Sequence, residues 1–156
     1  NGVDKFTGQF TRITKPERVI GTFFTTGDLS IKRIDTNYFV IFDYTISSYS
    51  DFDPYGINQN AQLLFLLENG DIVTLQSADA IKGAKQVLYL LPTVFTCNLT
   101  NVSYPVTPEQ LDKLLKSKVK TIRFYRNEST GKEDFIDNEI KKKNQDHIEK
   151  LVRRIS

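Results

Sequence analysis

Side chains able to perform proton transfer or nucleophilic attack are scarce in this chain, which holds one histidine, His147, and one cysteine, Cys97. A Ser/His/Asp or Cys/His catalytic set needs a histidine that moves protons near neutral pH. The spacing places no serine or cysteine beside His147, which lies one position from the apolar stripe of an expected helix. Cys97 shares a strand face with Phe95 and Leu99, where a thiol behaves as a small buried hydrophobe. We therefore interpret both residues as structural.

The sequence also lacks complete motifs for binding metal ions or phosphate groups. One Cys and one His cannot form a structural zinc site, and no G-x-G-x-x-G or Walker motif occurs among the eight glycines. Asp51, Asp53 and Gly56 match the first, third and sixth positions of a calcium loop, but Tyr55 and Gln62 occupy positions that need oxygen ligands. We predict no cofactor and no metal, with a weak cation at Asp51 and Asp53 left open.

A carboxylate on an apolar strand offers one hydrolytic hypothesis. Asp43 lies between Ile41 and Thr45, and a pair of carboxylates can hydrolyse glycosidic bonds. The sequence identifies no partner for Asp43. A structural aspartate whose hydrogen bonds are satisfied within the fold is the alternative interpretation.

The segment 47–60 (SSYSDFDPYGINQN) is the strongest candidate for a binding site. Its Ser, Asp, Pro, Gly and Asn residues predict an exposed loop, and exposed aromatics on a loop held by a rigid sheet often form a contact site for a glycan or a protein. The aromatics could instead fold back onto the core. The candidate ligand-binding residues are Tyr49, Asp51, Phe52, Asp53 and Tyr55, with Ile57 beside them.

Basic residues near the C-terminus suggest a second site, for a polyanion or nucleic acid. Residues 1–111 carry a net charge of −3 and residues 112–156 carry +5. Basic side chains interleaved with Phe124 and Tyr125 can hold single strands by charge and stacking. Apolar alternation in the same strand and a modest pI of 8.6 favour a solvated protein face instead. The candidate residues are Lys118, Lys120, Arg123, Arg126, Lys142 and Arg154.

The elements that must position these residues are mostly strands. The side chains of residues 38–46 point alternately to the two faces of a strand, and most of them are apolar on both faces. This pattern predicts a central strand. Asn69-Gly70, between two apolar runs, predicts a hairpin with a type I′ turn. Gly27-Asp28 is expected to be a turn between strands at 19–26 and 29–34.

Two helices are expected near the C-terminus. Thr107 as N-cap, Pro108 at the first helical position and Gln110 form a capping box, with Val106 packing on Leu111. Residues 138–155 carry apolar side chains at spacings of three and four, which predicts a second amphipathic helix.

Composition fits one globular domain over residues 1–156, with 39% hydrophobic and 26% charged residues. No apolar run reaches the roughly 20 residues of a spanning helix. The chain has no methionine, so we expect that a segment preceded Asn1, and a cleaved signal peptide and the remainder of a longer protein fit equally well.

The stretch 60–126, with LLFLLENGDIVTL, VSYPVTPEQLDKLLKS and VKTIRFYR, resembles small secreted or lipid-anchored proteins of unknown function from gut Bacteroidetes. The resemblance implies export and a β-rich domain, and it supplies no catalytic or binding residues. We predict an α+β fold, with a twisted antiparallel sheet of six to eight strands and two helices near the C-terminus. The predicted function is a non-enzymatic, extracytoplasmic (periplasmic, secreted or surface-anchored) binding domain, with polyanion binding as the alternative.

Overall fold

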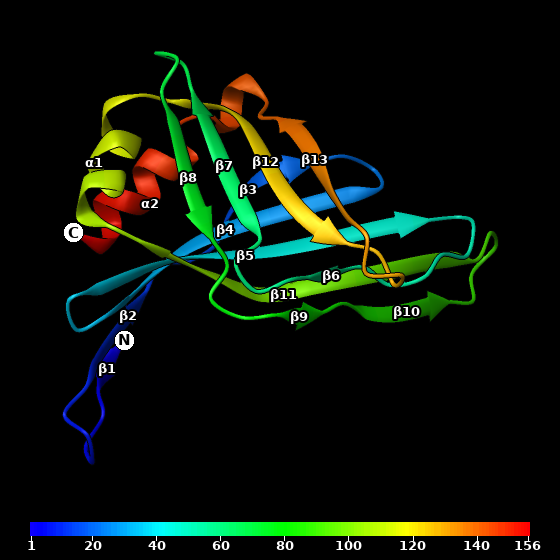
Figure 1. Cartoon of the computed structure of the whole chain (residues 1–156), viewed down its shortest axis with the longest axis horizontal. Coiled ribbons are helices and arrows are strands. Elements are labelled where there is room, and N and C mark those ends of the chain that lie inside the picture. The colour runs from blue at the N-terminus through cyan, green and yellow to red at the C-terminus, as the bar shows by residue number, and fades with distance from the viewer.

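The computed structural model describes residues 1–156, most of which lie in two antiparallel sheets. Sheet A has seven strands in the order β1-β2-β4-β5-β11-β10, with β3 also beside β4. Its strands are β1 (Gly2–Val3), β2 (Phe10–Ile13), β3 (Glu17–Gly21), β4 (Thr25–Ile34), β5 (Asn37–Ser48), β10 (Ala84–Leu88) and β11 (Val94–Val106). Sheet A forms the long axis of the molecule (Figure 1).

Sheet B has six strands in the order β8-β7-β12-β6-β9, with β13 beside β12. Its strands are β6 (Gly56–Ile57), β7 (Gln62–Leu67), β8 (Ile72–Gln76), β9 (Ile81–Lys82), β12 (Val119–Asn127) and β13 (Glu133–Glu139). The helices are α1 (Pro108–Lys116), the short 3₁₀ helix η1 (Lys142–Asn144) and α2 (His147–Ile155). Figure 1 shows sheet B crossing over sheet A, with α1 and α2 together at one end. The predicted α+β class with two C-terminal helices is confirmed, and its strands divide between two sheets.

The core lies between the two sheets. A cluster of 28 buried residues joins both sheets and both helices. At its centre the ring of Tyr44 on β5 lies 4.4 Å from that of Phe124 on β12, and Phe42 lies 5.4 Å from Phe124. β5 is the second-longest strand. Phe42 and Tyr44 are buried on one of its faces, and Ile41 is buried on the opposite face. The prediction of a central strand with two apolar faces is therefore confirmed.

Two local signals in the sequence produce a helix start and a hairpin at the expected positions. The Thr107 hydroxyl accepts the N–H of Gln110 at 3.2 Å, and the Gln110 side chain accepts the N–H of Thr107 at 3.0 Å. This is the predicted capping box. Asn69-Gly70 joins β7 to β8 as predicted, but only Gly70 has a positive φ, of 93°. Such a turn, with a single left-handed residue, is typical of a three-residue hairpin loop rather than type I′.

Two predicted boundaries are wrong. Gly27 and Asp28 are not a turn but lie within β4, and the chain reverses at Thr22, whose N–H bonds to the Thr25 carbonyl at 2.8 Å. Gly27 faces the core, where a Cβ would come within 3.1 Å of Ile20 and Phe42. Close packing therefore requires glycine in this strand.

The second helix begins at His147 rather than at residue 138. Asn138 and Glu139 pair with Ile122 and Thr121 on β12, so they extend β13 instead. Pairing with the preceding strand overrides the local helical periodicity at residues 138 and 139, and η1 precedes α2.

Candidate functional site

The segment predicted as an exposed loop is partly strand. Ser47 and Ser48 end β5, and Gly56 and Ile57 form β6, which pairs with β9 and touches β12. Ile57 is only 1% exposed. The expectation that Ile57 joins an exposed contact loop is therefore wrong, because β6 places its side chain in the core. Residues 49–55 remain as the connection between the sheets.

Phe52 and Tyr55 turn inward from this connection. Their rings lie 5.9 Å apart and both residues are only partly exposed. The guanidinium carbon of Arg126 lies 3.6 Å from the centre of the Tyr55 ring, and the Arg126 side chain is 12% exposed. Arg126 Nε donates to Asp134 Oδ1 at 3.2 Å. Phe52 and Tyr55 therefore anchor the connection, in agreement with the alternative in which the aromatics fold back.

The two aspartates of the segment contact different partners. Asp51 forms an ion pair with Lys85 of β10, and this hydrogen-bonded ammonium holds the pKa of Asp51 below its ordinary value. Asp53 Oδ2 accepts a hydrogen bond from the Ser129 hydroxyl at 3.2 Å. No group of three or more His, Cys, Asp or Glu side chains gathers to hold a metal ion.

Tyr49 is the member of the predicted set that stays at the surface, with 47% of it exposed. Its ring lies 5.5 Å from Phe24 and 6.3 Å from Phe23, and the two phenylalanine rings lie 4.8 Å apart. Phe23 and Phe24 occupy the turn between β3 and β4, which the sequence did not single out. The Ser47 N–H bonds to the Phe24 carbonyl at 2.7 Å and ties this turn to β5.

A second group of exposed apolar residues lies at the same end of sheet A. The hairpin between β10 and β11 carries Leu88, Tyr89, Leu90 and Leu91, which are 48%, 87%, 63% and 102% exposed. The register pairs Thr25 with Ile46, Ser48 with Phe95, and Leu88 with Val94. The three chain connections therefore lie at one end of the sheet, opposite the helices (Figure 1).

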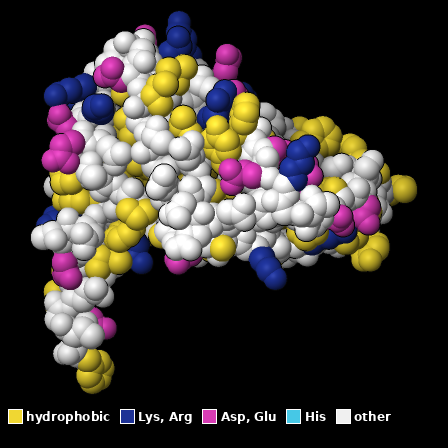
Figure 2. Space-filling model, viewed as in Figure 1, with side chains coloured by type: hydrophobic (Ala, Val, Ile, Leu, Met, Phe, Trp, Pro, Cys, Tyr) yellow, Lys and Arg dark blue, Asp and Glu magenta, His cyan; other side chains and the backbone are white.

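We call this surface the apolar end. It comprises Phe23, Phe24, Tyr49, Leu88, Tyr89, Leu90 and Leu91. Figure 2 shows hydrophobic side chains at this end in separate groups, with acidic and basic side chains between them. Residues 22–24, 49–50 and 88–93, which form it, contain no charged residue, and Asp51 follows directly after Ser50. Apolar residues scattered singly over a surface are ordinary, whereas seven large exposed ones on three neighbouring connections make this end a candidate contact site.

The basic candidates do not form one free cationic surface. Arg123 donates to Asp137 at 2.6 and 2.8 Å, which holds the pKa of that carboxyl below its ordinary value. Arg126 pairs with Asp134 and Arg154 with Glu17. Lys118, Lys120 and Lys142 are exposed. Because acids neutralise three of the six bases, this arrangement gives weaker support to polyanion binding than the sequence suggested.

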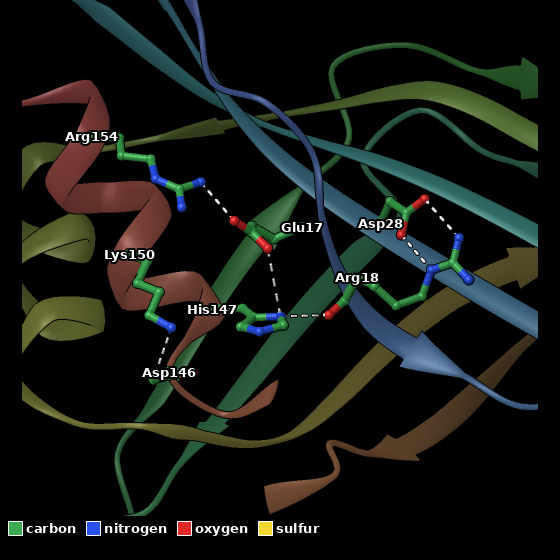
Figure 3. Close-up of polar contacts among 7 residues, drawn as sticks. All are labelled: Glu17, Arg18, Asp28, Asp146, His147, Lys150 and Arg154. Carbon is green, nitrogen blue, oxygen red and sulfur yellow. Dashed lines mark hydrogen bonds and ion pairs between the residues drawn. The ribbon is translucent and has the colours of Figure 1, made fainter. Parts of the chain in front are cut away.

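Arg154 and His147 attach α2 to β3 (Figure 3). Arg154 Nη1 donates to Glu17 Oε1 at 2.6 Å. His147 Nδ1 lies 2.8 Å from the Arg18 carbonyl oxygen and 3.9 Å from Glu17 Oε2. The contact to a carbonyl oxygen requires a proton on Nδ1. Both side chains therefore connect the terminal helix to sheet A.

Asp43 and Cys97 have structural partners as well. Asp43 Oδ1 accepts the N–H of Asn101 at 2.7 Å, where β11 bulges and Asn101 has a φ of 55°. Asp28 lies opposite Asp43 in the sheet, but Arg18 binds it at 2.7 Å. Neither carboxylate lines any of the five main surface hollows. Cys97 is buried, and burial raises the pKa of its thiol.

Neither helix has the length and apolar character needed to cross a bilayer. Comparison of the chain with profiles of known protein families, with curated protein sequences and with solved structures finds no match.

Proposed function

We propose that this chain is a non-enzymatic, extracytoplasmic binding domain that contacts an apolar partner through the apolar end. The observation that carries the proposal is the grouping of seven exposed apolar residues on three neighbouring connections of sheet A. Burying such side chains against a partner is favourable by roughly 1.5–3 kcal/mol each. The resemblance of residues 60–126 to exported proteins supports the location outside the cytoplasm.

The geometry favours a partner with an apolar surface over a glycan. The ring planes of Phe23 and Phe24 are inclined by 85°, and those of Phe24 and Tyr49 by 89°. A sugar stacks on a flat aromatic face. It also needs polar protein groups to bind its hydroxyls, because a hydroxyl buried without a hydrogen-bond partner costs free energy. The apolar end offers mutually perpendicular rings and no charged side chain.

Retention on the cell-envelope fraction of the source organism tests this proposal. The variant combines Phe23→Ser, Tyr49→Ser and Leu91→Ser, which replaces one exposed apolar side chain on each connection. The matched control combines Leu66→Ser, Ile72→Ser and Phe135→Ser, which are 39%, 54% and 49% exposed on the outer face of sheet B. We expect the wild type and the control to be retained and the apolar-end variant to be lost. Equal retention of all three proteins would contradict the proposal.

A further inference from the structure

We propose that the apolar end inserts into the surface of a lipid bilayer made of zwitterionic lipids. This inference rests on the proposed function, because it names the partner of that same surface. The first observation behind it is shape. Leu91, Tyr89 and Phe23 are 102%, 87% and 80% exposed, so they project from the ends of the strands.

No main hollow lies among these projecting side chains. The five main hollows of the surface are lined by other residues. A protein partner would have to supply a separate pocket for each projection, whereas a fluid bilayer adapts to a convex apolar shape. The exposed side chains of this end therefore fit a lipid phase.

Charge identifies the kind of lipid. Residues 22–24, 49–50 and 88–93 lack charged side chains, and Asp51, two residues after Tyr49, is neutralised by its ion pair with Lys85. Anionic membranes attract clusters of Lys and Arg, each of which contributes about 1 kcal/mol near the surface. Without such a cluster, the binding energy comes from apolar burial, so we expect binding to zwitterionic vesicles with little dependence on salt.

The depth of insertion follows from the backbone. In the hydrocarbon core an unsatisfied N–H or C=O group costs several kcal/mol, so lipid-exposed turns cannot enter it. Residues 89–93 form such a turn, in which the Leu90 N–H bonds to the Leu88 carbonyl at 2.8 Å. Tyr49 and Tyr89 carry hydroxyls suited to the headgroup layer. The apolar end therefore occupies the interface, with α1 and α2 pointing away from the membrane.

Flotation with phosphatidylcholine vesicles at low and high salt tests the inference. The wild type and the control variant, with Leu66→Ser, Ile72→Ser and Phe135→Ser, should float equally at both salt concentrations. The Phe23→Ser, Tyr49→Ser and Leu91→Ser variant should bind at least roughly tenfold more weakly, because each substitution removes apolar area from the contact. Wild-type protein that stays with the buffer would overturn the inference, as would binding that requires anionic lipid and disappears at high salt.

A single tryptophan reports where the contact occurs. The chain has no natural Trp, so Tyr89→Trp introduces a unique fluorophore at the apolar end and Ile72→Trp a matched one on sheet B. With vesicles present, emission from position 89 should shift to shorter wavelength and be quenched by brominated lipid, and emission from position 72 should not change. The opposite pattern, or no change at either position, would overturn the inference.

The two proposals fail in distinguishable ways. If retention on the cell envelope depends on the apolar end but pure vesicles do not bind, the lipid assignment is wrong and the same surface contacts a protein. If envelope retention does not depend on the apolar end, the proposed function is itself wrong.

Discussion

The guanidinium of Arg126 lies over the ring of Tyr55, with its carbon 3.6 Å from the ring centre. Arg126 is the second-last residue of β12. Tyr55 is the last residue of the connection between the two sheets, directly before β6. The contact is largely buried, since 12% of the Arg126 side chain is exposed. It therefore ties residues 49–55 to sheet B and leaves Tyr49 beside Phe24 at the surface.

Removing this contact should loosen the connection. We predict that Tyr55→Leu lowers the free energy of unfolding by about 2 kcal/mol, because a desolvated cation–π contact is worth that much. Amide hydrogen exchange of residues 49–55 should accelerate, and urea unfolding measures the loss. The control is Phe135→Leu, since Arg123 lies 4.1 Å above the exposed Phe135 ring. Exposed contacts are worth about 0.5–1 kcal/mol, so a loss as large as that at Tyr55 would contradict this explanation.

Tyr104 carries a buried hydroxyl without a hydrogen-bond partner. A buried, unpaired polar group costs about 1–3 kcal/mol. We predict that Tyr104→Phe raises the free energy of unfolding by about 1 kcal/mol, measured by urea denaturation. In the control, Tyr44→Phe, the hydroxyl that interacts with Thr25 is removed, and stability should fall. A loss of stability in Tyr104→Phe would show that its hydroxyl has a partner.

Gly27 and Gly21 make a matched pair of glycines on neighbouring strands. A Cβ at Gly27 would lie 3.0 Å from Ile20 Cδ1, whereas one at Gly21 would meet only the Arg18 side chain, at 3.5 Å. We predict that Gly27→Ala costs about 1–3 kcal/mol through overpacking. Gly21→Ala should change stability by less than about 0.5 kcal/mol. Thermal and urea unfolding of the two variants test this difference, and equal effects would contradict it.

Buried acidic groups should make the protein less stable at alkaline pH. Burial raises the pKa of Cys97 above its ordinary value of 9.0 and those of Tyr44 and Tyr104 above 10.0. Above these values the unfolded chain has released protons that the folded chain still holds, so the free energy of unfolding falls as pH rises. The decline should begin above pH 9.0 with Cys97 and steepen above pH 10.0 with the tyrosines.

The Cys97→Ala variant isolates the first step of this decline. Its urea midpoint should change less than that of the wild type as pH rises just above 9.0. The same pH dependence in both proteins would show that the Cys97 thiol does not contribute. Each protein's urea midpoint is compared with its own value at lower pH, so the effect of the substitution on packing, which does not depend on pH, cancels.

Features fixed by neighbouring residues could be predicted from the sequence. The capping box at Thr107 and the hairpin at Asn69-Gly70 depend on contacts a few residues apart, and both formed. The burial of Tyr55 depends on Arg126, which is far away in the sequence, so a local pattern could not decide between an exposed and an inward ring. The same reason explains Gly27, whose close neighbours Ile20 and Phe42 meet it only in the folded sheet.

The candidate site was found only in part. The polar loop around Tyr49 predicts its exposure, whereas the predicted strand at 19–26 places Phe23 and Phe24 inside a strand rather than in a turn. Tyr89 to Leu91 belong to an apolar run, a pattern that favours a buried strand over an exposed turn. The turn signals available in the sequence are Gly21, shortly before the two phenylalanines, and Pro92, directly after Leu91.

The central claim is that the apolar end is the surface that meets the partner, and photocrosslinking tests it most directly. A benzophenone side chain is placed at Tyr89 in one protein and at Phe135 in another, and each is irradiated with the cell-envelope fraction. Both positions are exposed aromatics, at 87% and 49%. We predict adducts, to lipid or to protein, from position 89 and none from position 135. Adducts from position 135 alone, or from neither position, would contradict the claim.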